Sequence, residues 1–133
     1  MTILVIEDSR FMQLAIEKAL RDAGHRAIIA PDGEAGLNAA IQQSPDFILL
    51  DIMLPSLPGT SVLRSLKLNP VTSTIPVIVL TGLTRVDQAR LKDEGADGYL
   101  AKSQLDLEGG GGALLRAMQD VVSKTAQTSP KRS

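Results

Sequence analysis

The 133-residue sequence predicts an α/β fold in which helices cover both faces of a parallel sheet. Two observations support this prediction. Short, almost wholly apolar segments, typical of strands buried on both faces, alternate with longer segments of helical periodicity. Several apolar segments also end directly on a charged or hydroxyl-bearing residue, as strands do at the ligand-binding edge of open α/β sheets. The alternation predicts a doubly wound sheet of five strands with five helices, joined by right-handed crossovers.

The first half of the chain is predicted to contain three strands and two helices. The strands occupy residues 3–6, 26–30 and 47–51. Ser9 can cap the first helix, whose apolar residues recur at helical spacing, and Gly24 ends it. After a Pro-Asp-Gly turn, Asp32 can cap a second helix over residues 34–43. Each of these helices therefore carries its own start signal.

The second half is predicted to add two strands and three helices. The strands occupy residues 76–81 and 98–102, and the helices occupy 61–68, 85–94 and a segment that includes 114–122. Thr60 and Thr84 are predicted N-caps, because a threonine hydroxyl can accept a hydrogen bond from the first helical turn. Four glycines at 109–112 form a flexible approach to the last helix. Residues 1–123 are expected to form one domain, and residues 124–133, which lack apolar periodicity, a disordered tail.

The composition is that of an ordinary globular domain: 44% of the residues are hydrophobic, 22% are charged and the formal net charge is −1. This charge balance does not favour nucleic acid or an anionic membrane as a direct partner. The absence of cysteine excludes disulfides and cysteine-ligated zinc or iron–sulfur sites. Because the sequence shows no basic leader and no apolar run of about 20 residues, we expect a cytoplasmic protein that does not insert into membranes.

Polar side chains follow four of the predicted strands, at the edge where ligands bind in such sheets. They are Glu7, Asp8, Asp51, Thr81 and Lys102. Three carboxylates against one ammonium leave an excess of negative charge that would raise pKa values or recruit a cation. Oxygen ligands that leave room for water favour Mg²⁺ over Ca²⁺. A lysine and a threonine hydroxyl beside such an ion suit a phosphoryl group.

The sequence resembles the receiver domain of two-component response regulators over roughly residues 2–122. The resemblance is carried by the acidic pair Glu7-Asp8, the Asp51-Ile52-Met53-Leu54-Pro55 turn with Gly59, Thr81 after an apolar strand, and Tyr99 three positions before Lys102. It implies a flavodoxin-like sheet with the strand order 2-1-3-4-5 in a stand-alone, single-domain receiver. It also implies that the protein is not an enzyme with a separate turnover substrate, beyond its own phosphorylation and dephosphorylation.

The resemblance also implies a role for each site residue. Asp51 would accept a phosphoryl group from a sensor histidine kinase or a histidine phosphotransfer protein. Mg²⁺ would be held by Asp8, Asp51 and the backbone carbonyl of Met53, with Glu7 acting through a water molecule. Lys102 would pair with the phosphoryl oxygens.

A conformational switch is implied for the response to phosphorylation. Thr81 would be drawn toward the phosphoryl group, and Tyr99 would move inward into the space released. Residues around 84–94 and 99–102 form the expected contact face for a downstream protein target. The signal would therefore pass through protein–protein contacts, with no direct binding of nucleic acid.

Several positions set this chain apart from the usual receiver pattern. Ser103 stands where the family usually has a cis proline, and because a cis bond before a residue other than proline costs about 3–4 kcal/mol, the sequence leaves open a trans bond with a displaced loop. The glycines at 109–112 and Pro58 also depart from the pattern, and Pro58 should stiffen the loop beside the acidic site. Met53 and Leu83 are apolar where receivers control the access of water to the acyl phosphate. We therefore expect slow autodephosphorylation.

Each site residue also has a plainer explanation when it is taken alone. Glu7 and Asp8 could merely cap the first helix, where negative charge is favourable. Thr81 could be an ordinary β-branched strand residue, and Lys102 a solvated strand end. Tyr99 could be an edge aromatic with its hydroxyl in water. Their joint occurrence, each at its own strand end, favours the shared site.

Other protein classes fit the sequence less well. A haloacid-dehalogenase-like phosphatase needs a second aspartate two residues after Asp51, where this chain has Met53. A flavodoxin-like FMN binder needs a Ser/Thr-rich phosphate loop and aromatic residues, which make up only 2% of this sequence. His25, predicted to lie exposed in a loop without a partner, is a poor phospho-donor. A phosphate-independent binding module and a phosphorelay shuttle stay open as alternatives to a signalling output.

Overall fold

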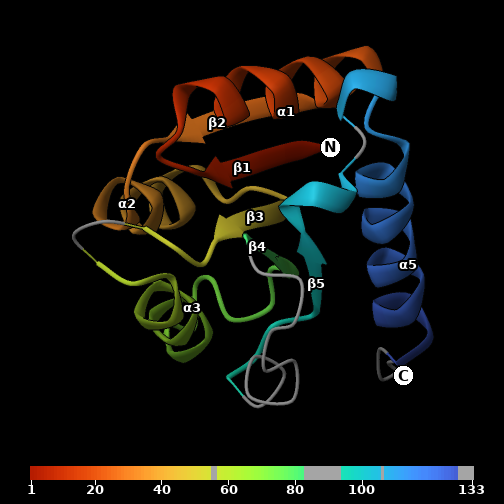
Figure 1. Ribbon diagram of the computed structural model, residues 1–133. Helices are drawn as coiled ribbons and strands as arrows, with labels where there is room; N and C mark the ends of the chain where they lie inside the picture. The colour runs from red at the N-terminus through yellow and green to blue at the C-terminus, as the bar shows by residue number, and fades with distance from the viewer. Residues whose placement is uncertain (55–56, 83–93, 106, 129–133) are drawn as a thin grey trace.

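The computed structural model describes residues 1–54, 57–82, 94–105 and 107–128. Its five strands pair in parallel in one sheet with the order β2-β1-β3-β4-β5 (Figure 1). The strands are β1 Thr2–Ile6, β2 Arg26–Ala30, β3 Phe47–Asp51, β4 Val77–Thr81 and β5 Gly98–Ala101. The predicted parallel sheet and its strand order are therefore confirmed.

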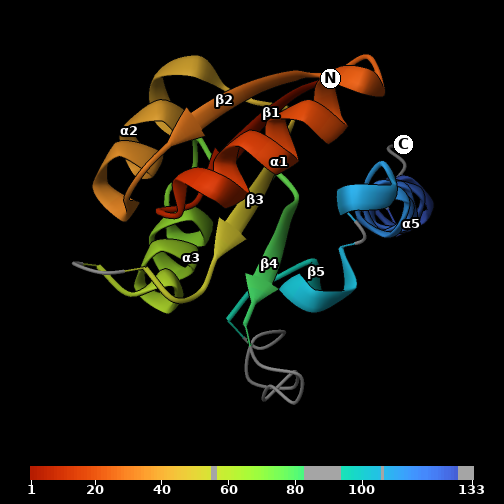
Figure 2. The ribbon, with the colours of Figure 1, turned by 45° about the horizontal axis from the view of Figure 1, so that its top comes forward.

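Helices cover both faces of the sheet. Those within the described residues are α1 Arg10–Asp22, α2 Gly33–Gln43, α3 Gly59–Leu68 and α5 Gly112–Thr128. α2 and α3 lie on one face, and α1 and α5 on the other (Figures 1 and 2). The helix predicted over 85–94 falls on residues that are not described, apart from its expected end at Glu94. In the part of the chain that the structure describes, no helix is both long and apolar enough to cross a bilayer.

Alternate side chains of the strands enter two separate cores. Leu4, Leu50 and Val79 are among those that pack against α2 and α3. Val5 and Leu49 are among those that pack against α1 and α5. Because both faces of the sheet are covered, the strands are apolar along their length, and polar residues are left to the strand ends. This arrangement accounts for the apolar runs that end in charged residues.

Two of the predicted helix caps are present. The Ser9 hydroxyl accepts a hydrogen bond of 3.3 Å from the N–H of Met12, at the start of α1. The Asp32 carboxylate accepts one of 2.8 Å from the N–H of Ala35, at the start of α2. Gly24, just past the end of α1, has a φ of +90°, as expected for a glycine that ends a helix.

Helix α3 begins earlier than predicted and without a side-chain cap. Thr60 lies inside the helix, so its predicted role as N-cap is wrong. Pro58 occupies the cap position, and the N–H of Gly59 donates to the carbonyl of Ile52 at 3.1 Å. A Cβ atom on Gly59 would lie 2.5 Å from Ile52 Cα and 2.6 Å from the carbonyl oxygen of Asp51. Glycine is therefore needed for α3 to start this close to the end of β3.

The chain passes from β5 to α5 through two short 3₁₀ turns. Lys102–Gln104 and Leu107–Gly109 form these turns, and Leu105 between them is fully buried. Gly110 and Gly111 have φ values of +98° and +75°, a left-handed conformation that favours glycine. The described residues contain no cis peptide bond, so the bond after the lysine, which the sequence left open, is trans.

Helix α5 continues beyond Ser123 and ends at Thr128. The predicted tail, residues 124–133, thus overlaps the end of this helix at residues 124–128. Lysine, alanine and glutamine, which occur in this stretch, are strong helix formers. A helix already anchored in the core by Leu114 and Met118 can continue through them without further apolar periodicity. Residues 129–133 lie outside the described part of the chain.

Candidate functional site

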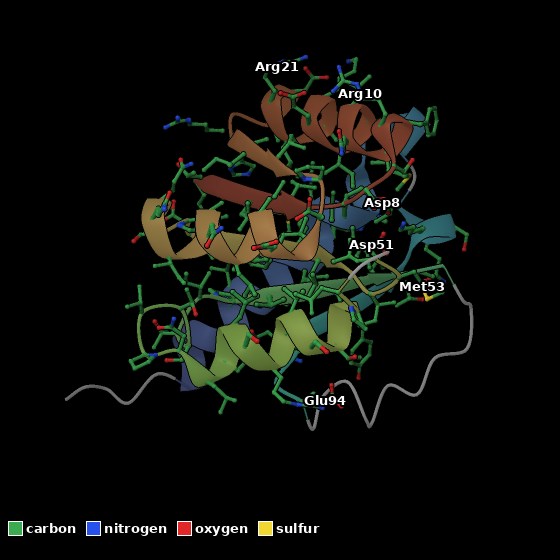
Figure 3. All side chains as sticks on the ribbon, turned by 90° about the vertical axis from the view of Figure 1, so that its left-hand side faces the viewer. Asp8, Arg10, Arg21, Asp51, Met53 and Glu94 are labelled. Atoms are coloured by element: carbon green, nitrogen blue, oxygen red, sulfur yellow. The ribbon has the colours of Figure 1, made fainter. Side chains whose placement is uncertain are left out.

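The carboxyl ends of four strands carry the polar residues that the sequence analysis singled out. Asp51 is the last residue of β3 and Thr81 the last of β4, whereas Glu7 and Lys102 directly follow β1 and β5. Parallel pairing brings these ends to one edge of the sheet. Figure 3 shows Asp8 and Asp51 close to each other at this edge. The predicted convergence at one site is therefore present.

Asp51 is buried at the end of β3, with 1% of its surface exposed. Its Oδ1 accepts a hydrogen bond of 2.9 Å from the N–H of Met53, which holds the carboxylate against the turn that follows. Its Oδ2 lies 3.2 Å from Lys102 Nζ. A buried carboxylate needs such a cation, because an isolated buried charge is strongly destabilising. One oxygen of Asp51 is thus fixed by the backbone and the other faces a positive charge.

Lys102 reaches both buried carboxylates of the site. Its Nζ atom lies 3.0 Å from Glu7 Oε1 and 3.3 Å from Glu7 Oε2, in addition to its contact with Asp51. Burial by itself would lower the pKa of this ammonium. The hydrogen bond to Glu7 and the negative charges of Asp51 and Glu7 outweigh burial and raise the pKa. Lys102 therefore stays charged throughout the physiological pH range.

Glu7 is fully buried, and its pKa is raised, mainly because burial disfavours the ionised form. The negative charge of Asp51 raises this pKa further. The N–H of Ser9, which donates to Glu7 Oε2 at 3.0 Å, and Lys102 lower it only in part. The sequence placed Glu7 in the site, but it did not predict that Lys102 would pair with this carboxylate.

Three carboxylates in this site can supply ligands for a cation. Glu7, Asp8 and Asp51 each offer one oxygen, and these oxygens lie within 4.8 Å of one another. Asp8 is exposed, while the other two are buried. Glu7 Oε1 and Asp51 Oδ2 face Lys102 but have no hydrogen-bond partner within the described part of the chain, so a cation could satisfy them. Oxygen-only ligands with room for water fit Mg²⁺.

Thr81 and Tyr99 lie on the same face of the sheet. Thr81 pairs with Ala101 in the ladder between β4 and β5, and Val79 pairs with Tyr99. Residues two apart on a strand share a face, so the Thr81 and Tyr99 side chains both point toward the side that α3 covers. Thr81 is 2% exposed, whereas Tyr99 is half-buried and packs against the core under α2 and α3.

The structure describes only one of the two positions predicted to tune dephosphorylation. Met53 is 64% exposed and follows Asp51 in the turn at the rim of the site (Figure 3). Leu83 lies outside the described residues, and so do residues 84–93 of the expected contact face. Tyr99 and Lys102, from the rest of that face, lie at β5 and directly after it.

His25 lies at the opposite edge of the sheet, before the start of β2. The predicted exposed, partnerless position is wrong, because His25 is half-buried and its Nδ1 lies 3.1 Å from the amino group of Met1. Burial, followed by the charge of that amino group, lowers the pKa of His25. Its distance from the acidic edge keeps it out of the site.

The sequence analysis missed Gln13, a buried residue of α1. Its Nε2 donates a hydrogen bond of 2.7 Å to the backbone carbonyl of Glu7. One signal in the sequence could have revealed it. Gln13 precedes Ile16 and Leu20 by three and seven residues, so helical spacing places it on the apolar face of α1. A polar side chain on that face must find a partner.

Comparison with known proteins shows which family this chain resembles. The family model described as "Response regulator receiver domain" matches residues 3–108. The transcriptional regulatory protein AfsQ1 of Streptomyces coelicolor is 37% identical over 102 residues, which are 76% of this chain and 44% of AfsQ1. Protein PilH of Pseudomonas aeruginosa is 36% identical over 101 residues, which are 75% of this chain and 84% of PilH. The chain spans less than half the length of several curated relatives, AfsQ1 among them.

Solved structures show the same architecture. The receiver domain of the sensor histidine kinase PA1611 from Pseudomonas aeruginosa is 31% identical and superposes with a TM-score of 0.75, over 89% of this chain and 97% of that domain. That structure is described with a magnesium ion coordinated in its active-site cleft.

Proposed function

The chain belongs to the receiver domain family of response regulators, and on that premise we propose that Asp51 is its phospho-acceptor. The observation that carries the proposal is the burial of Asp51 between the ammonium of Lys102 and the carboxylates of Glu7 and Asp8. This arrangement supplies a carboxylate nucleophile, a fixed positive charge and oxygen ligands for a divalent cation. Phosphoryl transfer depends mainly on such positioning and charge neutralisation.

In the proposed reaction, an oxygen of Asp51 attacks the phosphorus atom of a phosphohistidine on a partner protein. The P–N bond breaks as the P–O bond forms, and the imidazole nitrogen leaves with the electron pair. Lys102 is already 3.2 Å from Asp51 Oδ2, where it can pair with the oxygens of the incoming phosphoryl group. The proposed ligands of Mg²⁺ are Asp8, Asp51, the Met53 carbonyl and, through water, Glu7. The ion would neutralise negative charge on the phosphoryl group.

The proposed readout uses Thr81 and Tyr99. Thr81 ends β4, the strand that pairs with the one ending in Asp51, so it lies at the same edge of the sheet as the proposed phosphoryl group. Movement of Thr81 would change the space open to Tyr99, because both side chains lie on one face of neighbouring strands. The phosphoryl charge would thereby alter the surface around β5.

Receiver domains interact with histidine kinases or histidine phosphotransfer proteins. We propose one of these as the phospho-donor and a second protein as the target of the β5 surface. A shuttle in a phosphorelay is the alternative, in which the phosphoryl group passes onward to another histidine. Transfer of a radiolabelled phosphoryl group from Asp51 to a histidine phosphotransfer protein would distinguish the shuttle from an output domain.

The test is the intact mass of the protein after treatment with acetyl phosphate, with and without Mg²⁺. The wild type should gain one phosphoryl group only when Mg²⁺ is present, and Asp51→Asn should gain none. Asp22→Asn is the matched control, because Asp22 is an exposed aspartate that pairs with Lys18 on α1. A wild type that gains no mass under any condition would favour the phosphate-independent binding module instead.

A further inference from the structure

Gln13 is a buried polar residue that touches none of the reacting groups in the proposed reaction. Only 7% of its surface is exposed, and it lies on the face of α1 that carries Ile16 and Leu20 into the core. A buried amide is unfavourable unless it makes hydrogen bonds. Burial of an aliphatic side chain at this position would be more favourable, unless the amide makes a hydrogen bond that the protein needs.

The amide group makes a short hydrogen bond to the backbone just after β1. Gln13 Nε2 donates to the carbonyl oxygen of Glu7 at 2.7 Å. The strand pairing of β1 ends at Ile6, so this carbonyl lies beyond the ladder. On its other side, the N–H of Glu7 donates to the carbonyl of Ala30 at 3.0 Å. Glu7 is therefore held through both of its backbone polar groups.

The carbonyl that Gln13 holds belongs to the peptide group joining Glu7 to Asp8. The orientation of this planar group determines the direction in which Asp8 leaves the end of β1. Among the described residues, the carboxylate of Asp8 has no hydrogen-bond or ion-pair partner. By contrast, Ser9 and Lys102 hold the carboxylate of Glu7 directly. The position of the Asp8 carboxylate thus depends on the backbone that carries it.

We propose that Gln13 is a positioning residue: its amide fixes the Glu7–Asp8 peptide group and thereby holds the Asp8 carboxylate where it can share a cation with Asp51. The inference rests on the Mg²⁺ site of the proposed function. It adds a residue of α1 that acts on the site through the backbone. Some residues orient a metal ligand without binding the metal themselves. Removal of such a residue typically lowers metal affinity by about 10- to 100-fold.

The test compares Gln13→Met, which keeps the length of the side chain but removes the donor, with the wild type. Backbone amide NMR spectra are recorded during titration with MgCl₂, with no phospho-donor present. Gln13→Met should weaken Mg²⁺ binding about tenfold, and the amide resonance of Asp8 should move even before the metal is added. Gln13→Leu serves as a second donor-free variant in case the first does not fold.

Ile16→Val is the matched control, because it removes a buried methylene from the same face of α1 and leaves the Gln13 hydrogen bond intact. All variants should have a lower melting temperature, but only the Gln13 variants should lose Mg²⁺ affinity. Equal Mg²⁺ affinity in wild type and in a folded Gln13 variant would overturn the positioning role while leaving the Mg²⁺ site in place. A wild type that does not bind Mg²⁺ at all would overturn the metal site and this inference together.

Discussion

Lys102 Nζ lies 3.0 Å from Glu7 Oε1, so a side chain that follows β5 is paired with one that follows β1, although β3 and β4 separate these strands in the sheet. The same ammonium lies 3.2 Å from Asp51 Oδ2. One positive charge therefore serves two buried carboxylates. Burial, and to a smaller extent the negative charge of Asp51, raise the pKa of Glu7. This raised pKa and the excess of negative charge are the basis of the first two predictions.

Glu7→Gln should stabilise the metal-free protein at neutral pH. Burial raises the pKa of Glu7 above its ordinary value of 4.5, so the folded state binds this proton more tightly than the unfolded state. The wild type should therefore lose stability, relative to Glu7→Gln, as the pH rises above 4.5. Thermal unfolding from pH 4 to pH 8 measures the difference, and the melting temperature of Glu7→Gln should exceed that of the wild type by a margin that grows with pH. Equal melting temperatures across this range would contradict the prediction.

Mg²⁺ should raise the melting temperature of the protein, and EDTA should reverse the effect. At a concentration of 100 times the dissociation constant, a ligand that binds only the folded state adds about 2.7 kcal/mol of stability. Asp8→Asn should abolish most of this increase, because it removes an exposed ligand of the acidic cluster. Asp22→Asn removes an equal charge at a site on the outside of α1 and should retain the increase. The same shift in both variants would argue against a specific site.

Lys67→Met should destabilise the protein by about 1.5–3 kcal/mol, the usual contribution of hydrogen bonds to charged groups. Lys67 Nζ donates to the carbonyl of Ile75 at 3.0 Å and to Asp97 Oδ2 at 3.1 Å, and its side chain is only 19% exposed. These bonds connect α3 to the segments before β4 and β5. Urea denaturation measures the loss.

Arg64→Met is the matched control for this variant. Arg64 also reaches from α3 to the segment before β5, but its side chain is 60% exposed and its ion pair with Glu94 is 3.3 Å long. Because the arginine end of this pair is open to solvent, the pair should contribute at most about 1 kcal/mol. If the two substitutions had equal effects, the bonds of Lys67 to Ile75 and Asp97 would not be the source of the larger loss of stability.

Gly59→Ala should destabilise the protein by about 1–3 kcal/mol, the usual cost of overpacking. The new Cβ atom would meet the backbone of Ile52 and Asp51 at 2.5–2.6 Å, and backbone cannot move aside as a flexible side chain can. Gly82→Ala, where no atom lies within 4 Å of the added Cβ, should be nearly neutral. The free energies of unfolding of both variants, from urea titration, provide the check.

The double variant Met53→Asn, Leu83→Glu should lose its phosphoryl group faster than the wild type. Met53 is 64% exposed at the rim of the site, and a polar side chain there could hold a water molecule against the acyl phosphate. The half-life of the phosphorylated protein, followed by intact mass after removal of acetyl phosphate, is the measurement. A half-life no shorter than that of the wild type would count against control of water access by these two positions.

The sequence by itself determined the sheet, because strands buried on both faces must be apolar throughout and must place their polar residues at the ends. That rule located Glu7, Asp51, Thr81 and Lys102 at the strand ends from the sequence alone. It also gave the caps at Ser9 and Asp32, which depend on contacts within three residues. The two partners of such a cap are close together in the sequence, so the sequence alone is enough to predict the interaction.

The tertiary structure alone decided the contacts that depend on close approach between distant segments. The start of α3 at Gly59 follows from its approach to Ile52, which overrides the local preference for Thr60 as a cap. The continuation of α5 past Ser123 follows from its anchorage in the core. The partners of Lys102 and Gln13 were likewise hidden, because spacing along the chain shows which face a residue occupies and not which atom on that face it meets.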